Sequence, residues 1–291
     1  MVNGQRSTGA VVITGASTGI GRSTALALSR AGFHVFAGVR RPTDGTALQS
    51  LAKGELTPVI MDVTDEASIE AAVKQVAAAV GQQGIAGLVN NAGIAATWPM
   101  EAIPLDDLRW QYEVNVIGQV AVTQAFLPLL RLGHGRLINL GSIGDRITMP
   151  FGAPLTSSKW AFASITEALR VELRPWGIDV VLIEPGSIHT EAVDKVDKDA
   201  ARVLERMDPD NRARYGEAYR SMTHQTVERS RHGSSPDGVG AAVLHALTTR
   251  RPRTRYLVGK EVRVLAFLAK WAPDRLFDRI KIKIFRLPQH A

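Results

Sequence analysis

The sequence predicts an α/β fold in which a doubly wound parallel sheet is followed by a C-terminal helical extension. Short apolar runs rich in valine and isoleucine alternate along the chain with stretches of helical periodicity. Each run is apolar throughout instead of alternating, which is typical of parallel strands buried on both faces. The chain has 291 residues, 45% of them hydrophobic, and no linker or internal repeat divides it. We therefore expect residues 1–291 to form a single domain with a sizeable core.

Six apolar runs are predicted to contain strands, because they combine β-branched residues with a glycine or a polar turn at their ends. A short run at 255–259 continues the pattern late in the chain. The six runs lie at 10–15, 34–40, 56–65, 85–93, 135–142 and 178–186.

Helices are predicted between these strands. Ile69, Val73, Val76 and Val80 recur at helical spacing, and Gly32 gives the first helix a stop signal. The predicted helices span 19–32, 67–80, 106–132, 157–174 and 239–248.

Composition narrows the classes of function. The chain has no cysteine, which excludes disulfides, thiolate catalysis and thiolate metal sites and suits a reducing compartment. No signal peptide is evident at the start, and no run reaches about 18 uninterrupted apolar residues. We expect a cytoplasmic protein without a metal site.

The net charge of +7 gathers towards the C-terminus, where the extension 260–291 mixes apolar and basic residues. Pro273 splits this extension into two amphipathic pieces, which can lie on a membrane surface, cover a site or pack against another subunit. A basic balance also suits nucleic acid or a merely solvated face. We expect no nucleic-acid partner, because no groove-reading motif accompanies the charge.

A glycine-rich turn, TGASTGIG, joins the first predicted strand to the first predicted helix. Glycines let the chain turn tightly and let a pyrophosphate approach the backbone, while the helix start offers free N–H groups. With a strand before it and a helix after it, this turn predicts a Rossmann-type nucleotide site. Its candidate cofactor-binding residues are Gly15, Ser17, Thr18, Gly19, Ile20 and Gly21.

The end of the second strand favours NADP(H) over NAD(H). An acidic residue at this place binds the ribose hydroxyls of NAD, whereas an arginine accommodates the 2′-phosphate of NADP. Val39 stands where the acid is expected, and Arg40 and Arg41 follow it. We expect Arg40 to be the main phosphate contact; both arginines being simple surface charges is the alternative.

The order of motifs resembles the short-chain dehydrogenase/reductase family. The turn fits TGxxxGxG, and DVTD, NNAG, NVIG and PGSIHT follow it in the expected order. The stretches GRLINLGS, ALRVEL and RYLVGK resemble the hydroxysteroid and retinol dehydrogenase branches. The specific motifs cover about two-thirds of the chain, from Val11 to Thr190.

The resemblance implies further cofactor contacts. Asp62, with the Val63 backbone nearby, would contact the adenine, and PGSIHT would lie over the nicotinamide amide. The residues implied in this way are Asp62, Val63, Asn91, Ala92, Gly93, Lys159, Pro185, Gly186, Ile188 and Thr190.

The resemblance also implies a catalytic set with one member missing. Ser142 would orient the substrate oxygen, Lys159 would bind the ribose, and Asn115 would hold a helix distortion and a water. The family's tyrosine stands four residues before the lysine and thirteen after the serine, and both spacings lead to Leu155. Leucine cannot donate a proton, so the acid that the chemistry needs is absent from its usual position.

Three interpretations stay open at this stage. The chain is an oxidoreductase with another proton source, such as a water held by Ser142 and Lys159, or His189. Alternatively, it is a non-catalytic NADP(H)-binding protein, or a deliberately inactivated variant of an active enzyme. Tyr112 and Tyr215 are the nearest tyrosines in the sequence.

The substrate is expected to be a lipophilic alcohol or carbonyl compound. Trp98, Met149, Phe151 and Leu155 suggest an apolar pocket, although all could equally be core residues. The polar, charged segment 190–235 falls where the family has its substrate lid, and long loops often serve as lids. The family's long helices, here 106–132 and 157–174, imply a homodimer or homotetramer.

Overall fold

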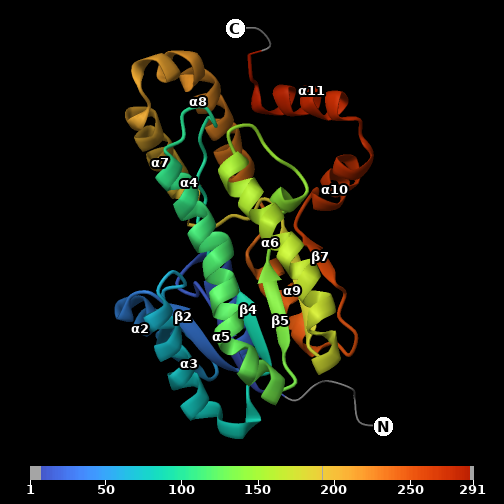
Figure 1. Ribbon diagram of the computed structural model, residues 1–291. Coiled ribbons are helices and arrows are strands. Elements are labelled where there is room, and N and C mark those ends of the chain that lie inside the picture. Colours follow the sequence, from blue (N-terminus) through green and yellow to red (C-terminus); the bar gives the residue numbers. More distant parts are fainter. Residues whose placement is uncertain (1–7, 192, 289–291) are drawn as a thin grey trace.

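A seven-stranded parallel sheet forms the centre of the protein, in a computed structural model that describes residues 8–191 and 193–288. The strand order is β3-β2-β1-β4-β5-β6-β7, and every neighbouring pair is parallel (Figure 1). All six predicted strands are confirmed, and the run at 255–259 adds the seventh. The strands are β1 (Ala10–Ile13), β2 (His34–Val39), β3 (Leu56–Ile60), β4 (Gly87–Asn90), β5 (Arg136–Leu140), β6 (Asp179–Pro185) and β7 (Arg255–Val258).

Helices cover both faces of the sheet, as the continuous apolar strands predict. On one face, α1 (Gly19–Arg30) packs against α9 (Asp237–Thr248). On the other, α3 (Glu66–Val80) packs against α5 (Gly118–Leu132), and α6 (Ala153–Glu172) lies beside α5 (Figure 1). The fold is therefore a doubly wound α/β sandwich.

Helices α2 (Pro42–Leu51) and α6 differ from the sequence prediction in their existence and their start, respectively. Helix α2 was not predicted, because it buries only Gly45 and Leu48 and so has little apolar periodicity. Helix α6 begins at Ala153, four residues before the predicted start, and has Pro154 in its first turn. Proline is tolerated there because the first helical N–H groups have no partner within the helix. Leu155 and Lys159 consequently share one helix.

The predicted helix 106–132 is interrupted at its centre. Helix α4 (Leu105–Tyr112) leads into a π-helical turn, η2 (Glu113–Ile117), and α5 follows. By length and composition, Leu105–Leu132 is apolar enough to span a membrane, but 56% of its most apolar window is buried within the protein. π-Helical turns are rare and often occur at functional sites.

The segment 190–235 is mostly helical, so its expected loop character is wrong. Helix α7 (Val193–Arg206) and helix α8 (Pro209–Arg231) form an antiparallel pair above the sheet (Figure 1). Asp208 begins α8 by accepting a hydrogen bond from the backbone of Asn211 at 2.9 Å, followed by Pro209 at the first helical position. A cap and a proline at these positions are strong helix-start signals that the high polarity obscured.

The C-terminal extension forms two helices separated at Pro273, as predicted. They are α10 (Val262–Trp271) and α11 (Asp274–Phe285). Helix α10 contacts β7, and α11 contacts α8, where Ser221 donates a hydrogen bond to the Phe285 carbonyl at 2.9 Å. The extension therefore runs from the sheet edge to the α7–α8 pair (Figure 1).

Candidate active site

The glycine-rich turn lies between the carboxyl ends of β1 and β4, where the strand order reverses direction. Ligands of doubly wound folds bind at this switch point. Gly15 and Gly19 have φ values of 63° and 54°, which favour glycine. A Cβ on Gly21 would lie 2.2 Å from the Gly15 carbonyl oxygen, so only glycine fits there. The turn thus leaves its backbone open to a phosphate group.

The motif NNAG fixes this turn from the neighbouring strand. The Asn91 amide donates to the carbonyls of Thr14 and Gly15, at 2.9 and 3.0 Å. In return, Thr14 Oγ1 accepts from the backbone N–H groups of Asn91 and Ala92, each at 2.9 Å. Asn91 therefore braces the turn. Gly93 lies beside Asn115, because a Cβ added to Gly93 would lie 3.3 Å from Asn115 Oδ1.

The two arginines after β2 have different surroundings. Val39 is buried, whereas Arg40 and Arg41 are exposed. Arg41 donates two hydrogen bonds to Asp44, at 2.9 and 3.0 Å, and this pairing raises the pKa of Arg41. Among the described residues, Arg40 makes no ion pair within 4.0 Å.

Asp62 lies just past β3, at the same edge of the sheet. Its Oδ1 accepts hydrogen bonds from the backbone and the hydroxyl of Thr64, at 3.0 and 2.8 Å. The neighbouring Val63 is buried. These bonds fix the carboxyl group beside the turn that carries Val63.

The segment after β6 lies over the glycine-rich turn. Ile188 is buried and pairs with Ser234 in an isolated bridge, and a Cβ on Gly19 would lie 3.3 Å from Thr190 Cγ2. The next residue, Glu191, accepts a hydrogen bond from the Gly19 N–H at 3.1 Å and pairs with Arg22. PGSIHT is thus brought against the turn, together with Glu191 and Arg22, which the sequence analysis did not single out.

Asn115 lies at the centre of the π-helical turn and is almost fully buried. Its Oδ1 accepts from the Ile94 N–H at 2.8 Å, and its Nδ2 donates to the Ile94 carbonyl at 3.0 Å. The same Nδ2 lies 3.2 Å from Ser158 Oγ, and Ser158 donates to the Leu155 carbonyl at 2.7 Å. Ser158 therefore links Asn115 to the helical turn that carries Leu155.

Lys159 points back to the end of strand β5. Its Nζ donates to the Leu140 carbonyl at 2.8 Å. Burial lowers the pKa of Lys159 to about 8, and the nearby Asp145 carboxyl opposes this effect. A lysine with this pKa loses its proton far more readily than an exposed lysine.

Ser142 stands two residues after the end of β5, where Lys159 bonds the Leu140 carbonyl. Its side chain caps a short 3-10 helix, η3 (Ile143–Asp145), by accepting from the Gly144 N–H at 3.0 Å. A serine hydroxyl that accepts one bond still has its own hydrogen to donate. Ser142 can therefore donate to an oxygen atom in the site.

A cluster of buried charges lies behind η3 and was not predicted. The Glu184 carboxylate is buried and accepts from Arg146 and Arg255, at 2.6 and 2.7 Å. Burial, together with Glu184, raises the pKa of Asp145 to about 8. Asp145 contacts the backbone of Ser142, so the cluster supports the loop that carries the serine.

The other proton-bearing side chains are placed differently. His189 is exposed, and its backbone N–H is bonded to the Ser234 carbonyl at 3.0 Å. Tyr215 on α8 donates a hydrogen bond to Glu101 in the loop after β4, which raises the pKa of Tyr215. Tyr219 is buried and bonded to the Thr97 carbonyl at 3.1 Å, and burial raises its pKa. The two tyrosine hydroxyls are thus engaged by Glu101 and Thr97, and the histidine is exposed.

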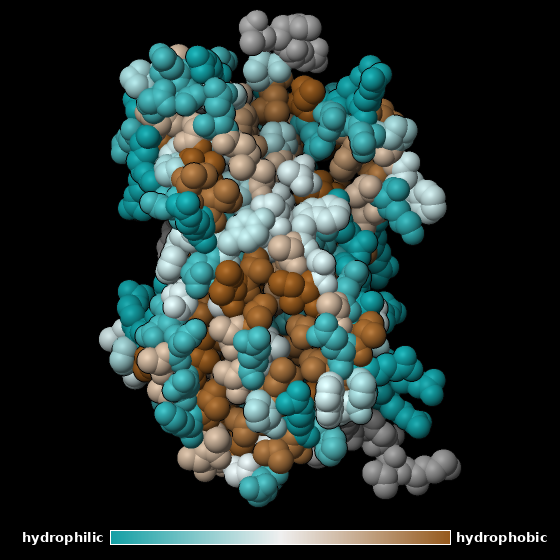
Figure 2. All heavy atoms as spheres, in the orientation of Figure 1, coloured by the Kyte–Doolittle hydropathy of each residue, from teal (hydrophilic) through white to brown (hydrophobic). Residues whose placement is uncertain are grey.

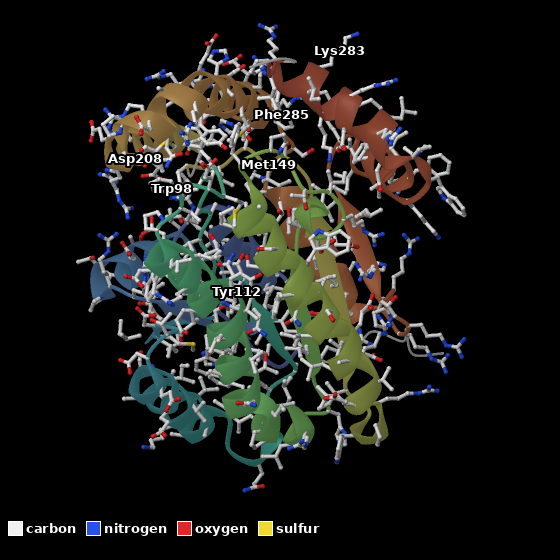
Figure 3. The ribbon with its side chains drawn as sticks, turned by 45° about the horizontal axis from the view of Figure 1, so that its top comes forward. Trp98, Tyr112, Met149, Asp208, Lys283 and Phe285 are labelled. Atoms are coloured by element: carbon white, nitrogen blue, oxygen red, sulfur yellow. The ribbon has the colours of Figure 1, made fainter. Side chains whose placement is uncertain are left out.

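Two of the apolar residues expected near the substrate, Trp98 and Phe151, pack against the α7–α8 pair. Trp98 is only 1% exposed and packs with Met207, Tyr219 and Met222 of the α7–α8 pair. Phe151 contacts the same cluster, with its ring 5.8 Å from that of Tyr219. Figure 3 shows Trp98 beside the α7–α8 pair, with Met149 and Phe285 nearby. In this conformation, Trp98 is a core residue of the lid.

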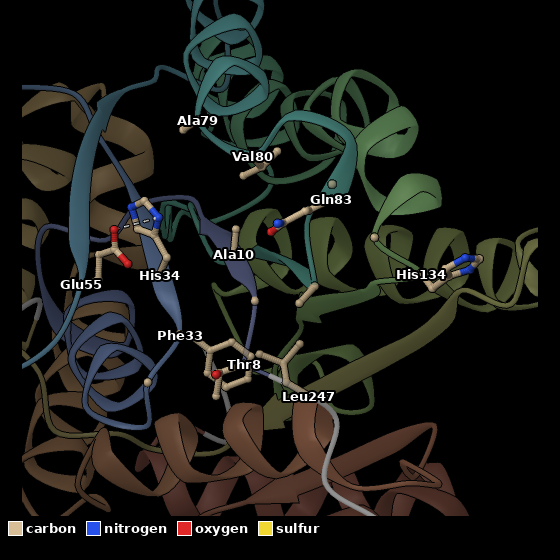
Figure 4. A pocket seen from close by; sticks show the side chains of 15 residues that line it. Thr8, Ala10, Phe33, His34, Glu55, Ala79, Val80, Gln83, His134 and Leu247 are labelled. Carbon is tan, nitrogen blue, oxygen red and sulfur yellow. Dashed lines mark ion pairs between the residues drawn. The ribbon is translucent and has the colours of Figure 1, made fainter.

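A groove of about 780 Å³ lies at the opposite edge of the sheet. It is lined near the amino ends of β1 and β2 by residues that include Ala10 and His34, and His34 pairs with Glu55 at 3.3 Å (Figure 4). Active sites of doubly wound folds lie outside the carboxyl ends of the strands. We therefore do not assign the reacting centre to this groove.

These features define a doubly wound α/β protein with a glycine-rich turn at the switch point of its sheet, and comparison with known proteins identifies the family. A family model described as short chain dehydrogenase matches residues 9–201, more than half of the sequence. The chain belongs to the short-chain dehydrogenase family, whose members are oxidoreductases. This confirms the resemblance and the parallel Rossmann-type fold.

The relatives point to the retinol and hydroxysteroid type. The chain is 34% identical to Retinol dehydrogenase 5 of Mus musculus, covering 97% of this chain and 90% of the relative. It is 34% identical to Estradiol 17-beta-dehydrogenase 2 of Rattus norvegicus, covering 93% and 73%. It is 32% identical to an NADPH-dependent 3-dehydrocapnine reductase of Ornithobacterium rhinotracheale, covering 94% and 95%.

Solved structures agree on the fold. A short-chain dehydrogenase from Streptomyces avermitilis matches with a TM-score of 0.73 at 24% identity, covering 97% of this chain and 96% of that one. A short chain dehydrogenase from Burkholderia cenocepacia, solved in complex with NADP, matches with a TM-score of 0.69 at 25% identity, covering 94% and 98%.

Proposed function

We propose that the chain is an NADP(H)-dependent oxidoreductase that acts on a lipophilic alcohol or carbonyl compound with weakened proton transfer. The observation that carries this proposal is the bond from Lys159 to the Leu140 carbonyl, which holds the lysine at the carboxyl end of β5, two residues before Ser142. Ser158 links Asn115 to the same helix as Lys159. The nicotinamide would supply or accept the hydride. The residues of this chain would hold the cofactor and manage the proton.

Each residue has a task that its surroundings support. The turn Gly15–Gly21 would hold the pyrophosphate on backbone N–H groups. Lys159, whose pKa is lowered to about 8 by burial, would bind the ribose and respond to the charge of a neighbouring group. Ser142 would donate a hydrogen bond to the substrate oxygen, and Asn115 would hold the start of the proton path through the Leu155 turn.

Leu155 weakens the proton step and favours a second candidate function. A positioned acid is typically worth about 10²- to 10⁴-fold in rate. Without it, a water held by Ser142 and Lys159 is the proton source that the geometry best supports, since His189 is exposed. The second candidate is a non-catalytic NADP(H)-binding protein, which would bind the cofactor and show no turnover.

The preference for NADP(H) rests on Arg40 and is tested by titration. Arg41 is engaged with Asp44, whereas Arg40 is exposed beside the buried Val39. We expect tighter binding of NADPH than of NADH by fluorescence titration. Arg40→Ala should weaken NADPH binding by about tenfold and leave NADH nearly unchanged, because the arginine would bind the phosphate that only NADPH carries.

Arg41→Ala is the matched control, and it should change NADPH binding less than Arg40→Ala does. Equal affinities for the two nucleotides, or an equal loss in both variants, would overturn the assignment of Arg40.

The substrate class follows from the relatives and from the lid. The names of the relatives include a retinol dehydrogenase and an estradiol dehydrogenase, which are enzymes of apolar alcohols. Phe151, Met149 and Leu155 are half-buried just before and within the first turn of α6. A panel of lipophilic ketones and aldehydes with NADPH should show slow turnover, whereas binding without any turnover selects the non-catalytic candidate.

The C-terminal extension is proposed to rest on an anionic membrane surface of the cytoplasm. Val264, Phe267 and Trp271 recur along one side of α10 and are 62%, 63% and 65% exposed. The stretch 260–286 has eight basic and three acidic residues, a net charge of +5 out of +7. Exposed aromatic residues flanked by lysine and arginine are typical of helices that lie in the membrane interface.

Vesicle sedimentation tests this contact. The protein should bind vesicles that contain phosphatidylserine more strongly than vesicles of phosphatidylcholine alone, because the extension is basic. The double variant Phe267→Ser/Trp271→Ser should lose most of this binding, while Trp176→Ser, which changes an exposed tryptophan elsewhere, should retain it. Equal sedimentation of all three proteins would contradict the proposal.

A further inference from the structure

The amino end of helix α1 is occupied by a side chain of the protein itself. Thr18, the residue before the helix, makes no side-chain cap. Instead, the Glu191 carboxylate accepts a hydrogen bond from the Gly19 N–H at 3.1 Å, across 172 residues of sequence. The other oxygen of the same carboxylate pairs with Arg22 in the first turn of the helix.

The surroundings of Glu191 are those of an anion site. The first N–H groups of a helix have no partner within it, and the helix dipole favours negative charge there. The pKa of Glu191 is lowered by its own backbone N–H and further by Arg22 and the Gly19 N–H, against partial burial. Glu191 is therefore an anion at neutral pH.

This position coincides with the one proposed for the cofactor. The backbone of Gly19 belongs to the glycine-rich turn, whose N–H groups are expected to bind the pyrophosphate. Thr190 lies directly over the same glycine. Two anions cannot accept from one N–H group at the same time with full strength, so Glu191 and a pyrophosphate compete for it.

We propose that the Glu191 carboxylate is an internal competitor of the cofactor pyrophosphate, which has to leave Gly19 and Arg22 when NADP(H) binds. The inference rests on the proposed function, because it assumes that this turn binds the cofactor. The departure of the Glu191 carboxylate releases Arg22, which can then contact a phosphate group. Glu191 thereby lowers the cofactor affinity, since part of the binding energy is used to displace it.

The opposite role for Glu191 makes the opposite prediction. If the contact with Arg22 were a clasp that closes over a bound cofactor, removing the carboxylate would weaken binding. The sign of the change in affinity therefore separates the two roles. Both Glu191 and Arg22 are partly exposed, so their substitution is compatible with a folded protein.

The test is NADPH titration of Glu191→Gln and Glu191→Ala beside the wild type. We expect both variants to bind NADPH about 3- to 30-fold more tightly, because a charged hydrogen bond and an ion pair no longer have to be broken. Glu217→Gln removes the same charge from an exposed position on α8 and should leave the affinity unchanged. Circular dichroism of each variant verifies that it is folded.

A thermodynamic cycle adds a second, independent measurement. In the wild type, Arg22→Gln loses a phosphate contact but also releases Glu191, so the two effects oppose each other. In the Glu191→Gln variant, only the loss of the phosphate contact remains. Arg22→Gln should therefore weaken NADPH binding more strongly in that variant than in the wild type.

The outcomes separate this inference from the proposed function. Unchanged or weaker NADPH binding by both Glu191 variants, with the wild type binding normally, overturns the competitor role alone. The absence of NADPH binding by the wild type and all variants overturns the proposed function, and the competitor role with it.

Discussion

Asp145 and Lys159 flank the end of strand β5, and burial moves their pKa values in opposite directions. The pKa of Asp145 is raised to about 8 by burial and by Glu184, and that of Lys159 is lowered to about 8 by burial. Both groups therefore titrate near pH 8, far from the usual pKa values of a carboxyl group and of a lysine. The charge behind Ser142 and Leu155 is thus sensitive to small changes in the site.

The substitution Asp145→Asn should reveal the raised pKa of Asp145 through the pH dependence of the free energy of unfolding. The folded state holds the Asp145 proton up to about pH 8, whereas the unfolded state loses it near its usual pKa of 3.8. The contribution of Asp145 to stability is therefore present below the unfolded pKa and is lost as the pH rises through about 8. We expect the free energy of unfolding of the variant, relative to that of the wild type, to increase by at least about 1 kcal/mol from acidic to mildly alkaline pH.

Denaturant unfolding at several pH values between the two pKa values measures this effect. Asp106→Asn, at an almost fully exposed position, is the control and should leave the pH trend unchanged. Parallel stability curves for the wild type and Asp145→Asn would show that Asp145 is ionised in the folded protein.

At the residue level, the sequence predicted what depends on local spacing. The two distances that lead to Leu155, and the glycines of the turn, are properties of short stretches of chain. Contacts between distant segments were missed, such as Glu191 with Gly19 and Arg146 with Glu184. They depend on which strands become neighbours, and periodicity carries no information about that.

The α7–α8 pair is attached to the loop after β4 through a small apolar cluster. Trp98, from the loop after β4, is buried among Met207, Tyr219 and Met222, and Arg206 lies 5.3 Å from the centre of its ring. This cluster is separate from the two cores of the sheet, and polar contacts such as Arg206 with Asp107 and Tyr215 with Glu101 add to the attachment of the pair.

Trp98→Ala should release the lid without unfolding the sheet. Replacing a buried tryptophan by alanine lowers stability by about 3–5 kcal/mol, and here the lost contacts are those that pack α7 and α8. Hydrogen exchange of the amides of these two helices should accelerate strongly, while β1, β4 and β5 stay protected. Trp176→Ala, at an exposed tryptophan, should leave exchange in the lid unchanged, and equal exchange in both variants would contradict the role of Trp98.

Among the elements, strands were easier to predict than the helices of the lid and the centre. Buried parallel strands are continuous apolar runs, so all six were found. Helices α7 and α8 were taken for a loop because their polar residues obscure the caps at Asp208 and Pro209. The π-helical turn at Asn115 depends on its bonds to Ile94, which no period in the sequence reveals.

The whole molecule has an apolar face that suits a second copy of the chain. Ile117 and Trp160 are 55% and 50% exposed, and Val171 on α6 is 68% exposed. Figure 2 shows hydrophobic residues gathered over the face where α5 and α6 lie in Figure 1. Monomeric proteins rarely expose a large continuous apolar patch, so we propose that these helices form the interface of a homodimer or homotetramer.

Charged residues on this face should break the assembly. We expect the wild type to have the mass of a dimer or tetramer by light scattering, and Trp160→Glu/Val171→Lys to have that of a monomer. Leu51→Lys introduces a charge at an exposed leucine on α2 and should leave the mass unchanged. A monomeric wild type at the same concentration would contradict this interface.

In the proposed site only the acid at position 155 is missing, and one substitution tests this proposal. Leu155→Tyr should raise NADPH-dependent reduction of a lipophilic ketone by about 10²- to 10⁴-fold, the usual worth of a positioned acid. Leu155→Phe, which adds the ring without the hydroxyl, should show no such increase. If Leu155→Tyr binds NADPH as the wild type does and still shows no gain in rate, the account of a site that lacks only its acid is wrong.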